Sequence, residues 1–597
     1  MENREVAKIL RETAQLLEID GAIVGRYRSY EKVAQLLDSL PDRIEDIAKD
    51  DAKLKALPGV GEGMAEHIHE ILRTGDYALR RKLLKKYQPT ILDLLQLQSL
   101  GPKKVALLWK KFKVATVEGV EKLAREGKLR DVEGFGEKSE HNILKAADMF
   151  KRSAGRFLLN VADEEAATLC AYIRGVGDAV ESVTPAGSLR RGKETIGDLD
   201  LLVSMRPKAN LEKAIGTVAR HILKYPRIQE KLAHGENKVS VLLDSGLQVD
   251  VRLLDSNSFG AALMYFTGSK EHNVALRGRA NEMGWTLNEY ALTSLKGGKV
   301  IARKTEAEIY ERLKLDYIEP ELRENTGEIE AAEMGWLPKL VKLEDIRGDL
   351  QMHTTASDGN NSIEEMGEAA RMLGYEYIAL TDHSKAVTVA NGMDEKRTLE
   401  QIEKIRAAQK RVEGIRLLAG IEVDILKEGR LDLDDEVLAQ LDVVVASVHS
   451  YMNLGKEEMT DRLLAAIENP YTQIIAHPTG RLVLRREPFT YDMERILDAA
   501  KKHGVAMECN AYPDRLDLKD VHLRMAKERG VKIVISTDSH AAKNLTFMKY
   551  GVETARRGWI EKNDVLNTLP LDQFLRALRP KPLGAQPTVG KKRLARP

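Results

Sequence analysis

The sequence predicts a multidomain chain of α+β and α/β class: a helical N-terminal region, then an α+β unit, then an α/β unit. Three observations lead to this prediction. The chain has 597 residues, too many for one core and enough for about three to five domains. Residues 1–160 combine helical hydrophobic spacing with three glycine-containing turns. From residue 348 onwards, short apolar runs alternate with helical stretches, which indicates a parallel sheet with crossover helices.

The composition narrows the class of protein. Hydrophobic residues make up 43% of the chain, and the longest apolar runs are too short to span a bilayer, so we expect no membrane partner. The charged N-terminus does not read as a signal peptide. Cys170 and Cys509 lie too far apart for a disulfide framework, which suits a reducing cytoplasm. The formal net charge is +1, but residues 80–113 hold ten basic residues and one acid, Asp93. Such a dense positive segment favours DNA as a partner.

Two aspartates, Asp198 and Asp200, open an apolar run that is typical of a β-strand. Alternate side chains of a strand share a face, so the two carboxylates lie side by side and repel each other. A bound Mg²⁺ would remove that repulsion, since it prefers carboxylate oxygens and often shares itself with substrate phosphates. Asp250 lies in a second strand-like run, 247–254. If the two runs are neighbours, three carboxylates converge, enough for two metal ions and phosphoryl chemistry.

A Gly-Ser turn, Gly187-Ser188, precedes these aspartates and allows backbone N–H groups to approach a phosphate. Gly-Ser followed by Gly-Asp-Leu-Asp resembles the nucleotidyltransferase palm signature. The run 265–269 (Tyr-Phe-Thr-Gly-Ser), with Asn273 and Arg277 after it, is similar to the thumb entry of family X DNA polymerases. Over the whole chain, the sequence resembles the bacterial members of that family that have a C-terminal PHP domain.

The resemblance implies roles for these residues. The three aspartates would be catalytic and hold Mg²⁺ or Mn²⁺, one ion through all three and a second through Asp198 and Asp200. Arg191 would neutralise charge on the leaving pyrophosphate. The turn at 265–268 would crowd a 2′-hydroxyl, which favours deoxynucleoside triphosphates. The implied nucleotide-binding residues are Gly187, Ser188, Arg191, Tyr265, Phe266, Gly268, Asn273 and Arg277.

The three glycine turns of residues 1–160 each lead into a predicted helix, whose N-terminal backbone N–H groups form a phosphate site. The turns resemble helix-hairpin-helix motifs, which grip the DNA backbone without reading bases. In related eukaryotic enzymes a lysine after the first hairpin forms a Schiff base with an abasic sugar, but His67 stands here. Histidine forms no stable imine, so we expect no lyase at this position, and a nearby lysine such as Lys32 is the alternative, as a weak substitute. The predicted DNA-binding residues are Gly59, Gly61, Gly63, Gly101, Lys103, Lys104, Gly134 and Gly136.

In residues 348–570, seven short apolar runs end in residues of the type that bind metals. Polar residues at the carboxyl ends of parallel strands indicate a barrel, and histidine with carboxylate suits Mn²⁺ or Zn²⁺. The order of these residues resembles the PHP fold, a seven-stranded (β/α)7 barrel with a trinuclear metal cluster. The resemblance implies three ligand sets: His353, Glu422 and Asp538; Glu422, His449 and His477; and Asp358, His383 and His540.

One position departs from the PHP pattern. The family motif opens with His-x-His, whereas Gln351 precedes His353 here, and an amide oxygen is a weaker, neutral ligand. Arg481, four residues after His477, is either a phosphate-binding residue or a surface charge. A cluster of this kind generates hydroxide near neutral pH and clamps a phosphodiester.

The predicted domains follow from these motifs. They are a helical DNA-binding domain with the first hairpin (1–85), a fingers-like helical domain with further hairpins (86–160), a palm (161–262), a thumb (263–320), a polar linker (321–347), a PHP domain (348–575) and a basic disordered tail (576–597). The tail prediction rests on six basic residues, four prolines and no acid from residue 579 onwards.

Three functions are compatible with these predictions. The first is a monomeric DNA polymerase that fills short gaps during DNA repair and trims 3′ ends, as an exonuclease or 3′-end phosphoesterase, with its PHP domain. The second is a DNA-end binding scaffold whose PHP domain is structural, which Gln351 favours. The third is an RNA nucleotidyltransferase, against which the hairpin motifs and the turn at 265–268 argue.

Overall fold

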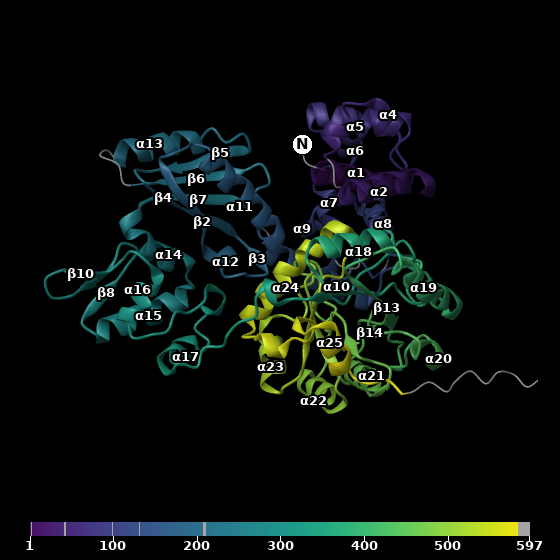
Figure 1. Ribbon diagram of the computed structural model, residues 1–597. Helices are drawn as coiled ribbons and strands as arrows, with labels where there is room; N and C mark the ends of the chain where they lie inside the picture. Colours follow the sequence, from purple (N-terminus) through teal and green to yellow (C-terminus); the bar gives the residue numbers. More distant parts are fainter. Residues whose placement is uncertain are drawn as a thin grey trace, which may run out of the picture. The chain divides into compact units, whose positions relative to one another are not determined.

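The structure is a computed structural model that describes residues 1, 3–40, 43–97, 100–130, 132–153, 155–206 and 211–582. The chain forms two compact units (Figure 1). The first comprises residues 1–154 with the short segments 484–487 and 541–543, and the second comprises the rest. None of the helices described here has both the length and the apolar character needed to cross a membrane.

The first unit is helical, as the sequence predicts. Side chains from both predicted N-terminal domains, from Val6 to Ala147, contribute to one hydrophobic cluster. The 1–85 and 86–160 segments therefore share a core. The helices are α1 (Asn3–Ile19), α2 (Val24–Ser39), α3 (Ile44–Ile47), α4 (Asp51–Lys55), α5 (Glu62–Thr74), α6 (Ala78–Tyr87), α7 (Ile91–Leu94), α8 (Pro102–Phe112), α9 (Val117–Arg125) and α10 (Glu137–Ser153).

The second unit begins with a five-stranded sheet in the order β2-β4-β7-β6-β5. Strands β4 and β7 are parallel, and the other neighbours in this sheet are antiparallel. Helix α11 packs beside β2, and the short pair β1–β3 lies apart from the sheet. The elements are β1 (Phe157–Leu158), α11 (Leu159–Arg174), β2 (Val180–Pro185), α12 (Gly187–Arg190), β3 (Thr195–Ile196), β4 (Asp198–Met205), α13 (Leu211–Ile222), β5 (Ile228–His234), β6 (Lys238–Leu243) and β7 (Gln248–Asp255).

A helical subdomain with a small antiparallel sheet, β10-β9-β8, follows. Its core includes Leu322, Ala332 and Leu340, so the 321–347 segment, expected to be a polar linker, is folded against the predicted thumb. The elements are η1 (Ser256–Ser258), α14 (Phe259–Thr267), α15 (Lys270–Glu282), β8 (Trp285–Leu287), β9 (Leu292–Ser294), β10 (Val300–Ala302), α16 (Glu306–Arg312), η2 (Pro320–Leu322), α17 (Glu328–Met334) and η3 (Leu343–Asp345).

The C-terminal part is a nearly closed parallel barrel whose seven strands follow one another in sequence order. Its strands are buried on both faces, which explains their continuous apolar runs, and helices surround them (Figure 1). The strands are β11 (Gly348–Asp349), β12 (Tyr377–Leu380), β13 (Arg416–Asp424), β14 (Val443–Ser447), β15 (Ile474–Ile475), β16 (Ala506–Asn510) and β17 (Ile533–Ser536). The helices are α18 (Ile363–Met372), η4 (Thr388–Ala390), α19 (Glu395–Ala408), α20 (Asp435–Leu438), α21 (Lys456–Glu468), α22 (Met493–His503), α23 (Asp520–Glu528), η5 (Ala542–Phe547), α24 (Met548–Arg557), η6 (Lys562–Asp564), η7 (Leu566–Thr568) and α25 (Leu571–Ala577).

Side chains complete the barrel between β11 and β17. The buried amide of Asn567 donates to the carbonyl oxygens of Gly348 and Ile535, both at 2.7 Å, and accepts from the Ile535 N–H at 3.0 Å. Beyond the strands, Met352 forms a parallel bridge with Ser539. The Asn567 amide thus pairs with backbone groups of β11 and β17 that would pair with each other if the two strands were hydrogen-bonded neighbours.

We expect Asn567→Ala to destabilise the barrel by about 3 kcal/mol or more, because it leaves several buried backbone groups unpaired. Urea unfolding measures this change. The control is Asn563→Ala, since Asn563 is exposed four residues earlier. Equal midpoints for the two variants would contradict the role of Asn567.

The end of the described chain is held on the barrel. Arg579 donates to the carbonyl oxygens of Ile467 and Asn469 at 2.9 and 2.8 Å. Lys581 donates to the Leu438 carbonyl at 3.1 Å. The first part of the predicted disordered tail, residues 576–582, is therefore ordered because its cations satisfy carbonyl groups. Residues 583–597 of that prediction lie outside the described residues.

Candidate active sites

The first candidate site lies where β4 and β7 run side by side. Asp200 is directly opposite Asp250 in the parallel register, and Asp198 shares the face of Asp200 because it is two residues away on the same strand. The structure thus brings together the three predicted carboxylates. The hydrophobic residues between them point to the other face and are buried in the core.

Charge repulsion is evident within this group. Burial raises the pKa of Asp200 to about 6, and the neighbouring charges of Asp198 and Asp250 add to the shift. Burial also acts to raise the pKa of Asp250, but Lys238, whose Nζ lies 2.7 Å from its carboxylate, lowers it. One oxygen of Asp250 is buried without a hydrogen-bond partner among the described residues. Three converging carboxylates with an orphaned oxygen fit a hard divalent cation.

Glycine is required at Gly187. Its φ is +59°, in the left-handed region, and a Cβ there would lie 2.7 Å from an Asp200 oxygen. Gly187 and Ser188 form the first residues of α12, so the predicted turn lies directly against the acidic group. The sequence motif and the carboxylates therefore belong to one site.

Arg191 follows on this turn and is mostly buried. It donates to the Thr267 carbonyl oxygen and, through Nε, to Glu324 at 3.1 Å. A Cβ on Gly268, whose φ is +70°, would lie 3.1 Å from the Arg191 guanidinium. The structure thus brings Arg191 together with the predicted sugar-sensing turn, although sequence reasoning did not identify Glu324 as its partner.

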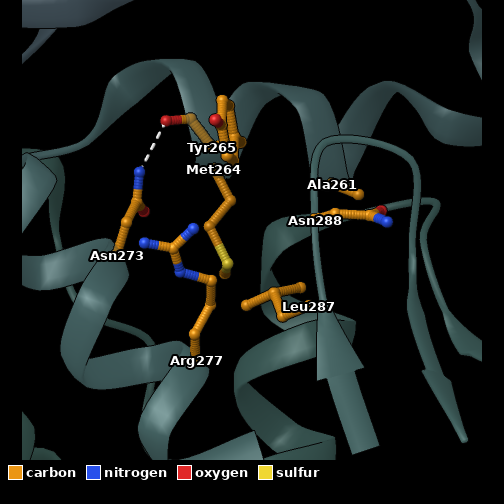
Figure 2. A pocket seen from close by; sticks show the side chains of 7 residues that line it. All are labelled: Ala261, Met264, Tyr265, Asn273, Arg277, Leu287 and Asn288. Atoms are coloured by element: carbon orange, nitrogen blue, oxygen red, sulfur yellow. Dashed lines mark hydrogen bonds between the residues drawn. The ribbon is translucent and has the colours of Figure 1, made fainter. Parts of the chain in front are cut away.

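Tyr265, Asn273 and Arg277 line one small pocket (Figure 2). Asn273 Nδ2 donates to the Tyr265 carbonyl oxygen at 2.7 Å, which fixes the amide at the edge of the pocket. Phe266 does not line this pocket; the guanidinium of Arg252 lies over its ring, 4.1 Å from the centroid. The sequence analysis missed the other lining residues, which are Ala261, Met264, Leu287 and Asn288.

The second candidate site lies at the carboxyl ends of the barrel strands, with Glu422 at its centre. The Nε2 atoms of His353, His449 and His477 lie 3.4, 3.4 and 2.9 Å from its carboxylate, and His383 Nδ1 lies at 3.3 Å. Burial acts to raise the pKa of Glu422, but the surrounding histidines lower it well below the usual value. One carboxylate is thus shared by four imidazoles.

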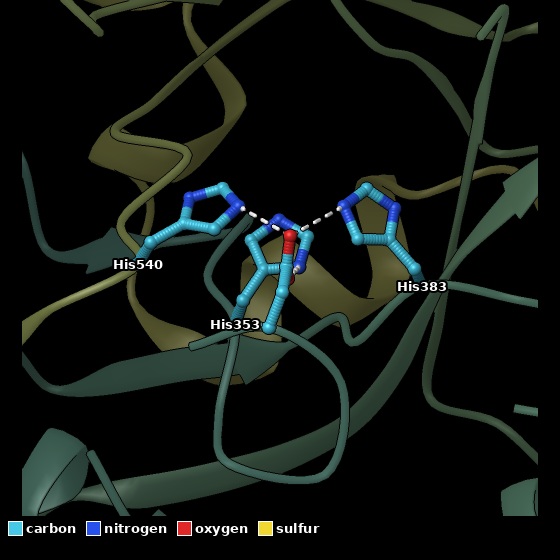
Figure 3. Close-up of side chains that lie close together, drawn as sticks. His353, His383 and His540 are labelled. Atoms are coloured by element: carbon cyan, nitrogen blue, oxygen red, sulfur yellow. Dashed lines mark ion pairs between the residues drawn. The ribbon is translucent and has the colours of Figure 1, made fainter. Parts of the chain in front are cut away.

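A second carboxylate, Asp358, lies next to the same cluster. His383 and His540 approach it with Nε2 at 3.7 and 3.5 Å, and His353 lies between them (Figure 3). His353 Nε2 also lies 3.1 Å from Asp538. Burial acts to lower the pKa of His353, but Asp538 and Glu422 raise it to about 10.

Seven of the eight predicted ligands fall into three overlapping groups of neighbouring ligand atoms. Two of these groups contain a complete predicted set, one of them with His353 added. In the third group His383 joins Glu422 and His449, whereas His477 lies outside the group although its Nε2 is 2.9 Å from the Glu422 carboxylate. The groups are His353, Asp358, His383 and His540; His353, Glu422 and Asp538; and His383, Glu422 and His449.

These groups have the properties of metal ligands. Imidazole with carboxylate suits Mn²⁺ or Zn²⁺, and metal coordination would satisfy buried donor atoms that lack hydrogen bonds. Asp424 lies 3.1 Å from His449 Nδ1, which leaves Nε2 facing Glu422. The buried atoms without a hydrogen-bond partner in the described part of the chain include both amide atoms of Gln351, Nδ1 of His353, His383 and His477, and Oε2 of Glu422.

Comparisons with known proteins agree with this arrangement. Models of the DNA polymerase beta thumb and of the PHP domain match residues 262–324 and 349–512. A helix-hairpin-helix domain model matches residues 1–77, and a SAM-like helix-hairpin-helix tandem matches residues 91–148. The chain is 36% identical to the DNA polymerase/3′-5′ exonuclease PolX of Bacillus subtilis (strain 168), over 96% of this chain and 98% of the relative.

The chain belongs to the family X DNA polymerases that carry a C-terminal PHP domain. The barrel of this family X polymerase also has relatives of its own. It is 30% identical to a probable phosphatase of Thermoanaerobacter sp. (strain X514), over 37% of this chain and 90% of the relative. A probable phosphatase of Acetivibrio thermocellus is 32% identical over 32% of this chain and 78% of the relative.

In this family X polymerase Arg481 fits neither predicted alternative. It is buried, and its guanidinium donates to the carbonyl oxygens of Arg515 and Leu516 and pairs with Glu194 at 2.7 Å. It therefore holds the loop after β16. Arg515 in that loop lies with Nε 3.2 Å from Asp538, and its terminal nitrogens have no hydrogen-bond partner among the residues described. Sequence reasoning missed Arg515 because no histidine marks the end of β16.

The predicted helix-hairpin-helix turns each precede a helix. Gly61 and Gly101 are the N-caps of α5 and α8, and Gly136 precedes α10. Gly59 and Gly134 both have φ of +80°, which favours glycine. Gly63 lies in the first turn of α5, and Lys103 and Lys104 lie in that of α8.

His67 stands in a half-buried aromatic setting. Its ring lies between Tyr30 and Tyr77, with centroids at 5.9 and 4.6 Å. Burial lowers the pKa of His67. This position therefore holds an imidazole packed against two phenol rings.

The raised pKa of Asp200 predicts an unusual effect of pH on stability. A carboxyl group whose folded pKa is raised favours folding below its unfolded pKa, and that contribution is lost as pH rises to about 6. In metal-free protein at pH 7.5, we expect Asp200→Asn to raise the unfolding midpoint by roughly 2–4 °C, the shift for 1 kcal/mol in a domain of about 200 residues.

Differential scanning calorimetry measures this effect. The gain should vanish towards pH 4, and Mg²⁺ should abolish it by stabilising only the wild-type site. A variant that is less stable than wild type at pH 7.5 without metal would contradict the electrostatic account.

Proposed function

We propose that this family X enzyme is a DNA-directed DNA polymerase that fills short gaps during DNA repair and trims 3′ ends with its PHP domain. The observation that carries the proposal is the register of β4 and β7, in which Asp200 faces Asp250 beside Gly187. The Bacillus subtilis relative, which bears both activities in its name, supports it along nearly the whole chain.

In the palm, Asp198, Asp200 and Asp250 would hold Mg²⁺ or Mn²⁺, and such ions lower the pKa of a primer 3′-hydroxyl and neutralise phosphate charge. The turn at Gly187 and Ser188 binds the triphosphate through backbone N–H groups. Arg191 binds it by charge, which requires that it leave Glu324, its partner at 3.1 Å.

The thumb residues position the nucleotide. Tyr265, Asn273 and Arg277 share a pocket, which suits contacts to the incoming base and the template. Gly268 places its backbone next to Arg191, so that a 2′-hydroxyl is crowded at that turn. Deoxynucleoside triphosphates are therefore the preferred substrates.

In the PHP domain, the eight clustered histidine and carboxylate side chains would hold Mn²⁺ or Zn²⁺, ions that supply a hydroxide nucleophile near neutral pH. Arg515 is held by Asp538 through Nε and presents its terminal nitrogens to the phosphodiester. A planar guanidinium with two free donors suits a phosphate.

We expect Arg515→Lys to lower Mn²⁺-dependent 3′ trimming about 10²-fold or more, since an ammonium cannot both hold Asp538 and bind phosphate in a fork. Gap filling should be unchanged. The matched control is Arg495→Lys, because Arg495 forms an exposed ion pair with Glu457 on the outside of the barrel. Trimming at the wild-type rate in Arg515→Lys would refute the role.

The remaining features concern DNA binding and the cellular setting of the enzyme. The glycine turns before α5, α8 and α10 bind the phosphate backbone, so affinity falls as salt rises. The protein acts as a monomer in the reducing cytoplasm, which suits its two buried free cysteines.

A gapped-duplex extension assay tests the proposal. Purified protein is given a one-nucleotide gap with deoxy- or ribonucleoside triphosphates and with Mg²⁺ or Mn²⁺. We expect extension with deoxynucleotides and, with Mn²⁺ and no nucleotide, shortening of the primer from its 3′ end. A protein that binds the gap but never extends it would refute the polymerase assignment.

Gln351 favours a second candidate, a DNA-end binding scaffold with a structural PHP domain. Its buried amide replaces a metal-binding imidazole, and both of its polar atoms lack hydrogen-bond partners in the described chain. A metal count on purified protein distinguishes the two: the enzyme holds ions in the barrel, whereas the scaffold holds none.

A further inference from the structure

An exposed aromatic residue stands at the mouth of the PHP barrel. Tyr451 lies two residues after His449, in the loop that follows β14, and it is 60% exposed. Among the described residues its ring packs on no other aromatic ring and its hydroxyl has no hydrogen-bond partner. Loops at the carboxyl ends of barrel strands surround the site, so this ring lies at the entrance to the metal cluster.

The backbone beneath Tyr451 is held rigidly. Arg462, a buried residue of α21, donates to the Ser450 carbonyl oxygen at 2.9 Å. The same guanidinium donates to the Leu426 carbonyl at 3.0 Å and to that of Ile425. One buried cation therefore ties the loop after β14 to the loop after β13. Tyr451 itself has a φ of +50°, a conformation that non-glycine residues keep only where the surroundings impose it.

The connection that Arg462 makes between these two loops places a lysine beside the Tyr451 ring. Lys427 Nζ lies 6.0 Å from the Tyr451 ring centroid. Within the described chain, Lys427 forms no ion pair. A flat aromatic face next to an uncompensated ammonium matches the two parts of a nucleotide, a base and a phosphate.

We propose that Tyr451 is a stacking platform for the terminal base of a single-stranded DNA 3′ end, with Lys427 bound to the adjoining phosphate. A base inside a duplex is covered on both faces by its neighbours, whereas an unpaired terminal base has a free face. Stacking accepts any base, so the platform selects unpaired ends without selecting sequence. This inference rests on the proposed 3′ trimming function and names the form of DNA that this site takes.

The main test compares two substrates in Mn²⁺. We expect Tyr451→Ala to lower kcat/KM about tenfold on a single-stranded oligonucleotide, the effect of losing one base–aromatic stack. Hydrolysis of bis(p-nitrophenyl) phosphate, which has no base, should be unchanged. Tyr451→Phe should retain wild-type activity on both. Tyr290→Ala, which removes a thumb tyrosine of similar exposure, 57%, is the control.

An oligonucleotide with a modified 3′ end distinguishes the loss of base stacking from a general loss of activity. An oligonucleotide whose last residue is abasic should be trimmed more slowly by the wild type, and Tyr451→Ala should cause no further loss on it. An equal loss on normal, abasic and small substrates would overturn the proposal, because it would show a general disturbance of the site.

A crosslinking experiment tests the contact between Tyr451 and the terminal base independently of catalysis. An oligonucleotide with 5-iodouracil at its 3′ end is irradiated with the protein without metal, and the crosslinked peptide is mapped. We expect Tyr451 in the wild type and no crosslink to this loop in Tyr451→Ala. If neither substrate is ever hydrolysed, the proposed trimming function fails, and the crosslink still decides this inference: a crosslink elsewhere overturns it.

Discussion

Replacing Asp250 with asparagine should lower gap filling at least about 10³-fold, the consequence of losing several kcal/mol of charge stabilisation at a metal site. The change removes one charge and almost no volume. Asp250 faces Asp200 across the parallel pair, so the substitution removes the carboxylate that β7 brings to this group. Lys238, which pairs with Asp250 at 2.7 Å, would remain partly exposed to water. Single-turnover primer extension measures the loss.

Binding and folding should survive this substitution. Fluorescence anisotropy should give the wild-type affinity for gapped DNA, because the proposed contacts with the DNA backbone come from the hairpin turns and not from the palm acids. Asp244→Asn is the matched control: Asp244 lies in the turn between β6 and β7, where it pairs with Arg227. Extension at a near wild-type rate by Asp250→Asn would refute the assignment of the palm acids.

Glu422→Gln should abolish 3′ trimming, with a fall of at least about 10³-fold, and leave gap filling unchanged. Glu422 is approached by His353, His383, His449 and His477. A neutral amide in its place leaves the histidines without the charge that draws cations into the barrel. Mn²⁺-dependent shortening of a primer, measured beside extension of the same primer, separates the two activities.

Metal analysis supplies a second measurement. Glu422→Gln should hold fewer ions per chain than the wild type, whereas Glu436→Gln, an exposed glutamate of α20, should hold the same number. Unaltered trimming in Glu422→Gln would show that 3′ shortening originates outside the barrel.

Much of both sites could be predicted from the sequence. The period of a strand places Asp198 and Asp200 on one face, and the alternation of strands and helices places histidines at one end of a barrel. The partition of those histidines is less easily predicted: His383 joins Glu422 and His449 in one group, and His477 approaches the same Glu422 carboxylate at 2.9 Å. Local spacing determines on which face of a strand, or at which end of the barrel, a residue lies. It does not determine the distances among side chains from different strands.

The arginine that we propose as a phosphate ligand shows the limit most clearly. The sequence leaves Arg481 as either a phosphate-binding residue or a surface charge, yet its guanidinium is used by the carbonyl groups of the loop after β16. Arg515 lies in that loop and contacts Asp538. The two arginines differ only in which carbonyl and carboxylate groups the fold brings to them.

By itself, the sequence predicts the candidate metal-binding side chains, the glycine turns that precede helices and the order of the predicted domains. These follow from residue type and from short-range periodicity. Only the tertiary structure decided which side chains meet, such as Lys238 with Asp250, Glu324 with Arg191, and Lys427 beside Tyr451. The physical reason is that partners distant in the chain are selected by packing and burial, which act on the folded molecule as a whole.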